Sequence, residues 1–166
     1  MSRAAELKGL MMRRPRLTLA VAESLTAGHV QARVAAASGA SNYFLGGVTA
    51  YTLDQKVRLL GVNRAHARRV NCVSQRVAVE MAVGAMQLFG ADLAVATTGY
   101  AEPARAAGVK SPMAWWAICQ RLPNGRLALN SGTIEVPGAD RLEAQTRIAE
   151  DVIGRLIAHL AAWRAK

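Results

Sequence analysis

The sequence predicts an α/β protein, a three-layer α/β/α sandwich built around a mixed, mostly parallel five-stranded sheet. Segments with the apolar pattern of strands alternate with segments of helical periodicity early in the chain, which is typical of parallel strand connections. Several predicted strands are apolar on both faces, as in a sheet that helices cover on both sides. One late hairpin signal, Asn124-Gly125, adds an antiparallel strand and makes the sheet mixed.

The first three elements have clear local signals. Apolar residues at helical spacing predict a helix over residues 3–13, which ends before Pro15 because proline cannot continue a helix. A compact run of apolar and β-branched residues at 17–22 predicts a buried strand. A second helix follows over residues 27–37, and Gly39 ends it.

The middle of the chain continues this alternation. Residues 45–51 have the composition of a strand, with glycines that allow another segment to approach closely. Residues 53–60 form a short helix that closes at Gly61. Ser74 is a good N-cap for a long helix over residues 75–89, which has one broad apolar face.

The last part of the chain predicts three strands and a final helix. Residues 92–98 and 113–119 are apolar on both faces and read as buried strands. The Asn124-Gly125 pair suits a type I′ turn, so the strand after it runs antiparallel to the one before. This last strand and the helix that follows it cover residues 126–136 and 140–164.

Length and composition narrow the class of protein. The chain has 166 residues, of which 52% are hydrophobic and 19% charged, so it is not a disordered chain. We expect a single domain over residues 1–166. No apolar run reaches the roughly 20 residues that span a bilayer, and no signal peptide is evident, so a cytoplasmic protein without membrane association is expected.

The charge leaves two interpretations open. Lys and Arg total 21 against 11 Asp and Glu, a net charge of +10. This charge indicates either binding of a nucleic acid or another anionic ligand, or an arginine-rich composition spread over a solvated surface. The basic residues cluster only at residues 13–16 and 64–69, so nucleic acid is the less favoured partner. The two cysteines and three histidines are scattered, so neither a metal nor a cofactor is expected.

Four segments contain side chains that could carry chemistry, and three of them follow predicted strands, where open α/β sheets bind ligands. Ser24 lies at a strand-to-helix turn and is either a helix cap, a phosphate ligand or a nucleophile, while Glu23 beside it is expected to pair with a neighbouring basic residue. Tyr51 and Lys56 either activate a serine or are a packed tyrosine and a surface lysine. Together these groups suit acyl transfer at an amide by a Ser–Lys mechanism. The four segments are residues 22–28, 49–56, 97–103 and 137–141.

Ordered motifs run through the same segments. The chain reads A-E-S-L-T-A-G at 22–28, S-G-A-S-N-Y-F at 38–44 and G-V-T-A-Y-T-L-D-Q-K at 47–56, followed by V-S at 73–74 and T-G-Y-A-E-P at 98–103. These motifs resemble the C-terminal domain family of the competence/damage-inducible protein CinA, and the resemblance covers about residues 5–160. The 166 residues match only that domain, so a stand-alone member is expected.

The resemblance implies a fold, an assembly and an activity. The fold is an α/β/α sandwich with a mixed five-stranded sheet, and such domains usually self-associate as dimers or larger oligomers. The activity is hydrolysis of the amide of nicotinamide mononucleotide to nicotinate mononucleotide and ammonia. The implied partner is therefore this small phosphorylated substrate or a related one.

The resemblance also implies roles for individual residues. Ser24 would be the nucleophile, Lys56 its base, and Tyr51 a support for this pair. Thr98, with Gly99 beside it, would hold the amide or the oxyanion. The remaining implied substrate contacts hold the phosphate at the helix N-terminus after Ser24 and at the start of the last helix: Thr26, Gly28 and Arg141.

Several positions depart from the family pattern, and they lie in the same motifs. Glu102 adds a negative charge where an anionic substrate would pass, and Trp115 is large enough to fill the pocket. Three readings therefore stay open: a working amidohydrolase, a divergent homologue that binds a ligand with impaired catalysis, and a nucleic-acid-binding or structural module. The departures are Leu25, Ala27, Glu102, Ala114 and Trp115.

Overall fold

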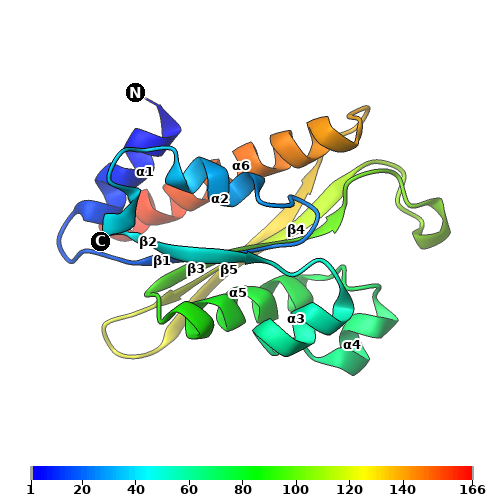
Figure 1. The fold of residues 1–166 in the computed structure, drawn as a ribbon, viewed down its shortest axis with the longest axis horizontal. Coiled ribbons are helices and arrows are strands. Elements are labelled where there is room, and N and C mark those ends of the chain that lie inside the picture. Colours follow the sequence, from blue (N-terminus) through cyan, green and yellow to red (C-terminus); the bar gives the residue numbers. More distant parts are fainter. Residues whose placement is uncertain (1, 166) are drawn as a thin grey trace.

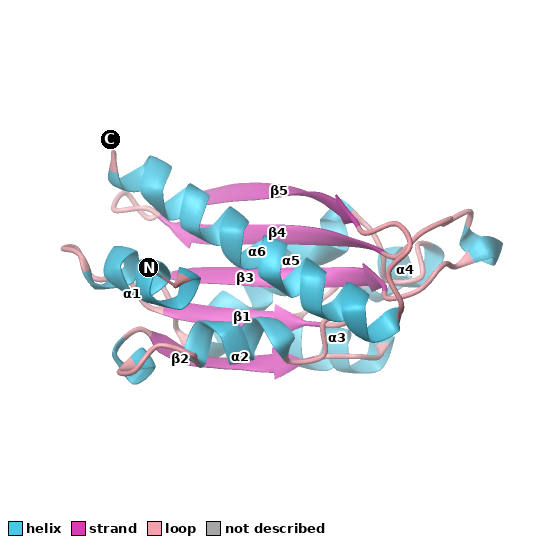
Figure 2. Cartoon of the chain, turned by 90° about the horizontal axis from the view of Figure 1, so that it is seen from above, coloured by secondary structure: helices cyan, strands magenta, loops and turns pink. Residues whose placement is uncertain are grey.

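The computed structural model describes residues 2–165 and contains one five-stranded sheet with strand order β2-β1-β3-β4-β5. Strand β1 pairs in parallel with β2 and β3, whereas β4 pairs antiparallel with β3 and β5. Strand β4 therefore runs opposite to the other four (Figure 2), and the predicted mixed sheet is confirmed. The strands are β1 (Leu19–Glu23), β2 (Phe44–Thr49), β3 (Leu93–Tyr100), β4 (Met113–Arg121) and β5 (Leu127–Glu135).

Helices cover both faces of the sheet (Figure 1), which confirms the predicted three-layer sandwich. One layer contains α1, α2 and α6, and the other contains α3, α4 and α5. Two short 3-10 turns, Ala40–Asn42 and Arg105–Ala107, lie in the connections. The helices are α1 (Arg3–Met12), α2 (His29–Ala35), α3 (Leu53–Leu60), α4 (Arg64–Arg69), α5 (Gln75–Phe89) and α6 (Arg141–Arg164).

The sheet separates two hydrophobic cores. The core under α6 contains large aliphatic side chains together with buried Trp116, whereas the core under α5 is built mainly from alanines and methionines. Trp115 packs half-buried against the α5 side, because consecutive residues of a strand point to opposite faces. Both faces of the central strands are thus buried, as their uninterrupted apolar sequence predicts.

Local signals set the ends of α3 and α5, whose bounds agree with those predicted from the sequence. The side chains of Thr52 and Ser74 accept hydrogen bonds from backbone N–H groups in the first turns of these two helices. Gly61 and Gly90 end them with φ of 65° and 64°, a left-handed conformation that glycine adopts at little cost.

The turn between β4 and β5 differs from the predicted type I′ turn. The backbone N–H of Gly125 donates to the carbonyl of Leu122 at 2.9 Å, which places Pro123 and Asn124 at the two central positions. A type I′ turn needs positive φ at both positions, but proline is held near −65°. Positive φ occurs instead at Gly125, at 78°, so the proline overrides the Asn-Gly signal.

None of the helices within residues 2–165 combines the length and the apolar character needed to cross a membrane.

Candidate functional site

A cavity of about 360 Å³ opens where β1, β2 and β3 end. It is lined by the turn after β1, the start of α3, the loop after β3 and the first residue of α6. Two of the predicted site residues, Thr26 and Gly28, do not line it. The structure brings together the other six: Ser24, Tyr51, Lys56, Thr98, Gly99 and Arg141.

Lys56 and Ser24 both line this cavity and contact each other. Lys56 Nζ lies 2.9 Å from Ser24 Oγ, and it also donates to the carbonyl of Ala50 at 2.8 Å and to that of Tyr51 at 3.2 Å. A charged ammonium therefore has an acceptor for each of its three hydrogens. A neutral amine could keep its two hydrogens on the carbonyls and turn its lone pair to the hydroxyl of Ser24. The arrangement thus suits both protonation states, as proton transfer between the two residues requires.

Burial favours the neutral form of this lysine. Lys56 is only 1% exposed, and the loss of solvent lowers its pKa below the usual value; negative charge on the nearby Cys72 sulfur, when it is a thiolate, would partly oppose this effect. Burial raises the pKa of Cys72 for the same reason, since the charged thiolate is disfavoured there. A lysine with a lowered pKa next to a serine is a recognised arrangement for activating a nucleophile.

Tyr51 contributes to two parts of the cavity. Its backbone carbonyl accepts a hydrogen bond from Lys56 Nζ. Its phenol hydroxyl accepts a hydrogen bond from Arg141 Nη2 at 2.7 Å. The other terminal nitrogen of Arg141 lies 3.2 Å from a carboxylate oxygen of Glu102. Three segments of the chain therefore meet around the guanidinium at the mouth of the cavity.

Thr98 and Gly99 lie at the end of β3. The hydroxyl of Thr98 donates its hydrogen to the carbonyl of Cys72 at 2.6 Å. Thr98 Oγ1 can therefore accept a hydrogen bond from a ligand but cannot donate one at the same time. This geometry suits a substrate N–H group and does not suit an oxyanion. Gly99 pairs with Ala114 of β4, and a Cβ atom at Gly99 would lie 2.1 Å from the carbonyl oxygen of Met113. Only glycine fits this close approach.

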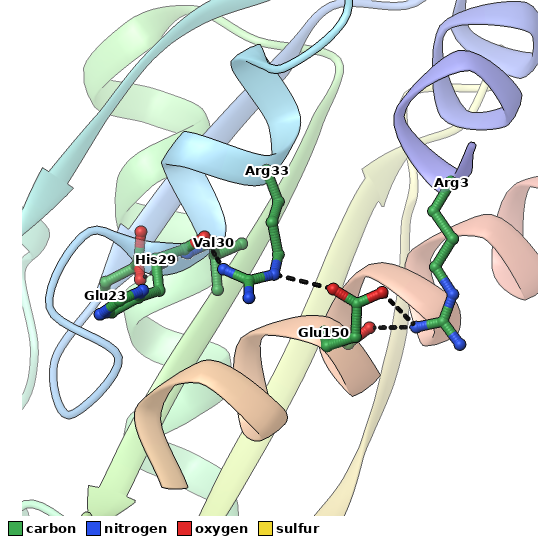
Figure 3. Close-up of polar contacts among 6 residues, drawn as sticks. All are labelled: Arg3, Glu23, His29, Val30, Arg33 and Glu150. Carbon is green, nitrogen blue, oxygen red and sulfur yellow. Dashed lines mark hydrogen bonds and ion pairs between the residues drawn. The ribbon is translucent and has the colours of Figure 1, made fainter. Parts of the chain in front are cut away.

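The N-terminus of α2 does not have free N–H groups for a phosphate, contrary to the prediction. The buried carboxylate of Glu23 accepts from the backbone N–H groups of Gly28 at 3.1 Å, Val30 at 3.0 Å and Gln31 at 2.8 Å. Figure 3 shows this side chain beneath the first turn of α2. Glu23 was expected to pair with a basic residue, and this expectation is wrong, because a carboxylate satisfies the unpaired N–H groups of a helix start equally well.

Thr26 and the far end of α2 have structural contacts. The hydroxyl of Thr26 pairs with that of Thr97 at 2.7 Å in the buried interior, which explains why Thr26 does not reach the cavity. On the surface, Glu150 of α6 lies between Arg33 of α2, at 2.9 Å, and Arg3 of α1, at 3.1 Å (Figure 3). These ion pairs connect α6 with α1 and α2 at the surface of the molecule.

Comparison with known proteins identifies the family. The sequence profile described as the CinA C-terminal domain matches residues 2–160. The chain belongs to this family.

Curated sequence relatives agree with this assignment. A CinA-like protein from Chlorobium limicola is 38% identical over 147 residues, which is 87% of this chain and 34% of the relative. A CinA-like protein from Mycobacterium marinum is 39% identical over 141 residues, which is 84% of this chain and 32% of the relative. The chain therefore spans about one third of the length of these relatives.

Solved structures share the whole fold. A CinA superfamily protein from Klebsiella pneumoniae 700603 superposes with a TM-score of 0.87 at 25% identity, with 97% of each chain covered. A competence/damage inducible protein from Agrobacterium tumefaciens gives a TM-score of 0.78 at 27% identity, covering 95% of this chain and 98% of that one.

The sequence analysis missed two residues that line the cavity. Asn71 and Cys72 line the cavity with φ of 48° and 61°, and Asn71 Nδ2 donates to the hydroxyl of Tyr100 at 3.1 Å. Asparagine is among the residues that adopt this left-handed conformation most readily, so Asn71 was a local signal for a tight turn. The family motif at residues 73–74 directly follows these two residues.

The departures from the CinA pattern have different consequences in the structure. Trp115 does not line the cavity but packs against the α5 layer, so the prediction that it could fill the pocket is wrong. Ala114 is buried on the α6 side of the sheet, whereas Leu25 and Glu102 line the cavity. Ala27 has φ of 48°, where the family pattern has glycine.

The described part of the chain, residues 2–165, contains no cluster of three or more side chains that could hold a metal ion.

Proposed function

We propose that this CinA family member is an amidohydrolase that converts the amide of nicotinamide mononucleotide, or of a related phosphorylated ligand, to the acid and ammonia. The observation that carries the proposal is the 2.9 Å contact between Ser24 Oγ and the Nζ atom of buried Lys56, inside a cavity of about 360 Å³. The family membership supports the choice of substrate.

The first half of the reaction forms an ester on Ser24. Neutral Lys56 takes the proton of the Ser24 hydroxyl while Oγ bonds to the amide carbon, and the carbonyl electron pair moves onto oxygen. When this pair returns, the bond from carbon to nitrogen breaks, and the nitrogen takes the proton from Lys56. Ammonia leaves, and the acyl group stays on Ser24.

The second half removes the acyl group. Lys56 takes a proton from a water molecule while the water oxygen bonds to the ester carbon. The bond from carbon to Ser24 Oγ then breaks, and Oγ recovers its proton from Lys56. One water is consumed and one ammonia released, and both Ser24 and Lys56 return to their initial states.

Two further groups suit the binding of this substrate. Thr98 Oγ1 already donates to the carbonyl of Cys72, so it can accept a hydrogen bond from the amide nitrogen of the substrate. Arg141 lies at the mouth with Tyr51 and would hold the phosphate, since a guanidinium can donate two parallel hydrogen bonds to it.

The test is an ammonia-release assay with purified protein and nicotinamide mononucleotide. We expect Ser24→Ala and Lys56→Met each to reduce release by at least about 100-fold, the usual scale for losing a nucleophile or its base. Ser38→Ala, an exposed serine outside the cavity, is the matched control and should behave as the wild type. No release above that of Ser24→Ala would reject the proposal.

A second candidate is a ligand-binding protein with impaired hydrolysis, and the contact between Glu102 and Arg141 favours it, because it occupies the proposed phosphate-binding group. Calorimetric binding of nicotinamide mononucleotide without any release of ammonia would favour this candidate.

A further inference from the structure

We infer that Glu102 is a specificity-determining residue, which competes with the phosphate of the substrate for Arg141. This inference rests on the proposed function, because it needs a phosphorylated ligand in the cavity. Glu102 follows β3, Arg141 begins α6 and Tyr51 follows β2, so the three side chains reach the mouth from three separate segments.

The guanidinium of Arg141 is engaged at both terminal nitrogens. Nη2 donates to the hydroxyl of Tyr51 at 2.7 Å, and Nη1 lies 3.2 Å from Glu102 Oε1. A phosphate that binds the fork formed by Nη1 and Nη2 with two parallel hydrogen bonds therefore competes with the carboxylate of Glu102 for Nη1. The hydroxyl of Tyr51 carries no charge and presents no such conflict.

Glu102 also decides the charge at the mouth. Among the described residues that line the cavity, it alone carries a carboxylate, whereas Lys56 and Arg141 are the basic residues there. The contact pairs the negative charge of Glu102 with the positive charge of Arg141 at the mouth. A displaced Glu102 would remain near the phosphate as a like charge, and such neighbours repel.

The contact is weak enough to be displaced. The side chains of Arg141 and Glu102 are 49% and 64% exposed, and ion pairs exposed to this degree contribute little to stability. Glu102 therefore does not close the cavity but weakens the binding of phosphorylated ligands. A ligand without a phosphate would not compete for Arg141 and would not be affected.

The experiment compares Glu102→Gln with Glu143→Gln. Glutamine keeps the shape of residue 102 without its charge, and Glu143 is an exposed carboxylate in the first turn of α6 that pairs with Arg147 at 3.2 Å and does not line the cavity. The probes are nicotinamide mononucleotide and the same nucleoside without its phosphate. For each variant, KM and kcat are measured with both.

We expect Glu102→Gln to lower KM for the phosphorylated probe by about threefold to tenfold, the scale of one nearby screened charge, with kcat within about twofold of the wild type. KM for the unphosphorylated probe should not change, and Glu143→Gln should change neither. In an Arg141→Ala background, Glu102→Gln should lose its effect, since the two residues act on each other. An unchanged or raised KM, an equal change with both probes, or an equal change in Glu143→Gln would overturn the inference.

Calorimetry in a Ser24→Ala background separates this inference from the proposed function, because no turnover occurs there. If Glu102→Gln tightens binding of nicotinamide mononucleotide but the wild type releases no ammonia, the inference holds and the proposed function fails. If the wild type hydrolyses the probe and Glu102→Gln leaves KM unchanged, the inference fails alone. No binding of the probe to any variant would reject both.

Discussion

Ser24 and Lys56 lie within hydrogen-bonding distance, 2.9 Å from Oγ to Nζ, because the parallel pairing of β1 and β2 aligns the ends of these strands. Glu23 is opposite Thr49 in the sheet, and the backbone N–H of Ala50 donates to the carbonyl of Glu23 at 2.9 Å. The turn that carries Ser24 and the turn that leads into α3 therefore leave the sheet side by side. Helix α3 then places Lys56 against the serine.

This contact predicts how the rate depends on pH. Lys56 must be neutral to accept the proton of Ser24, so kcat/KM for ammonia release should rise with pH through the pKa of Lys56. Burial lowers that pKa, so the rising limb should lie below about 10.4, the value of an unperturbed lysine. A pH–rate profile with nicotinamide mononucleotide measures the limb.

The variant Lys56→Arg provides the control for this profile. Arginine keeps a positive charge at all accessible pH values and cannot accept the proton, so the limb should disappear together with the activity. A wild-type rate that falls with rising pH between neutral pH and the limb would contradict the role of Lys56 as a base.

The elements that could be predicted from the sequence are those with local signals. Helices α3 and α5 have the predicted bounds because their caps and their terminal glycines lie within a few residues of the helix ends. The predicted strands differ from the observed ones by a few residues at their ends, since a strand end depends on its partner as well as on its own residues. The β4–β5 hairpin was predicted, but its turn type was not, because Pro123 overrides the Asn-Gly signal.

The candidate site also contains some features that local motifs predict and others that depend on how the chain packs. Ser24, Lys56, Thr98 and Arg141 lie in motifs that a single sequence displays, and the structure places all four around one cavity. The contact of Arg141 with Glu102 depends on how α6 packs near the end of β3, which no local pattern encodes.

Glu23 should contribute strongly to stability because its carboxylate is buried and accepts three backbone N–H groups. Glu23→Ala leaves these donors without their acceptor, and we expect the free energy of unfolding to fall by about 2–4 kcal/mol. Urea denaturation measures the change. Glu135→Ala removes an exposed carboxylate from β5 and should change the stability by less than about 0.5 kcal/mol. Equal effects of the two variants would show that the cap of α2 is dispensable.

Gly84 of α5 sets the position of α3. A Cβ atom at Gly84 would lie 2.1 Å from the carbonyl oxygen of Leu60, which is backbone and cannot rotate away. Gly84→Ala should therefore lower the free energy of unfolding by about 1–3 kcal/mol and reduce ammonia release, since α3 carries Lys56. Gly9→Ala is the matched control: Gly9 lies in α1 with nothing within 4 Å of an added Cβ, so alanine should stabilise the helix by about 0.5–1 kcal/mol. A destabilised Gly9→Ala or an unaffected Gly84→Ala would contradict this account of the packing.

Ala27 holds a conformation that suits glycine better. Its φ of 48° is left-handed, which costs an alanine about 1–2 kcal/mol, and its exposed side chain makes no buried contact that a substitution would remove. Replacing Ala27 with glycine removes this strain but also increases the conformational entropy of the unfolded chain, which offsets part of the stabilisation. Ala27→Gly should therefore raise the free energy of unfolding by about 0.5–1 kcal/mol. Ala158→Gly makes the same chemical change at an exposed position inside α6, where it should lower stability by about 1 kcal/mol. Urea unfolding of both variants tests whether the two substitutions change the free energy of unfolding in opposite directions. If Ala27→Gly lost as much stability as Ala158→Gly, the turn after Ser24 would not be strained.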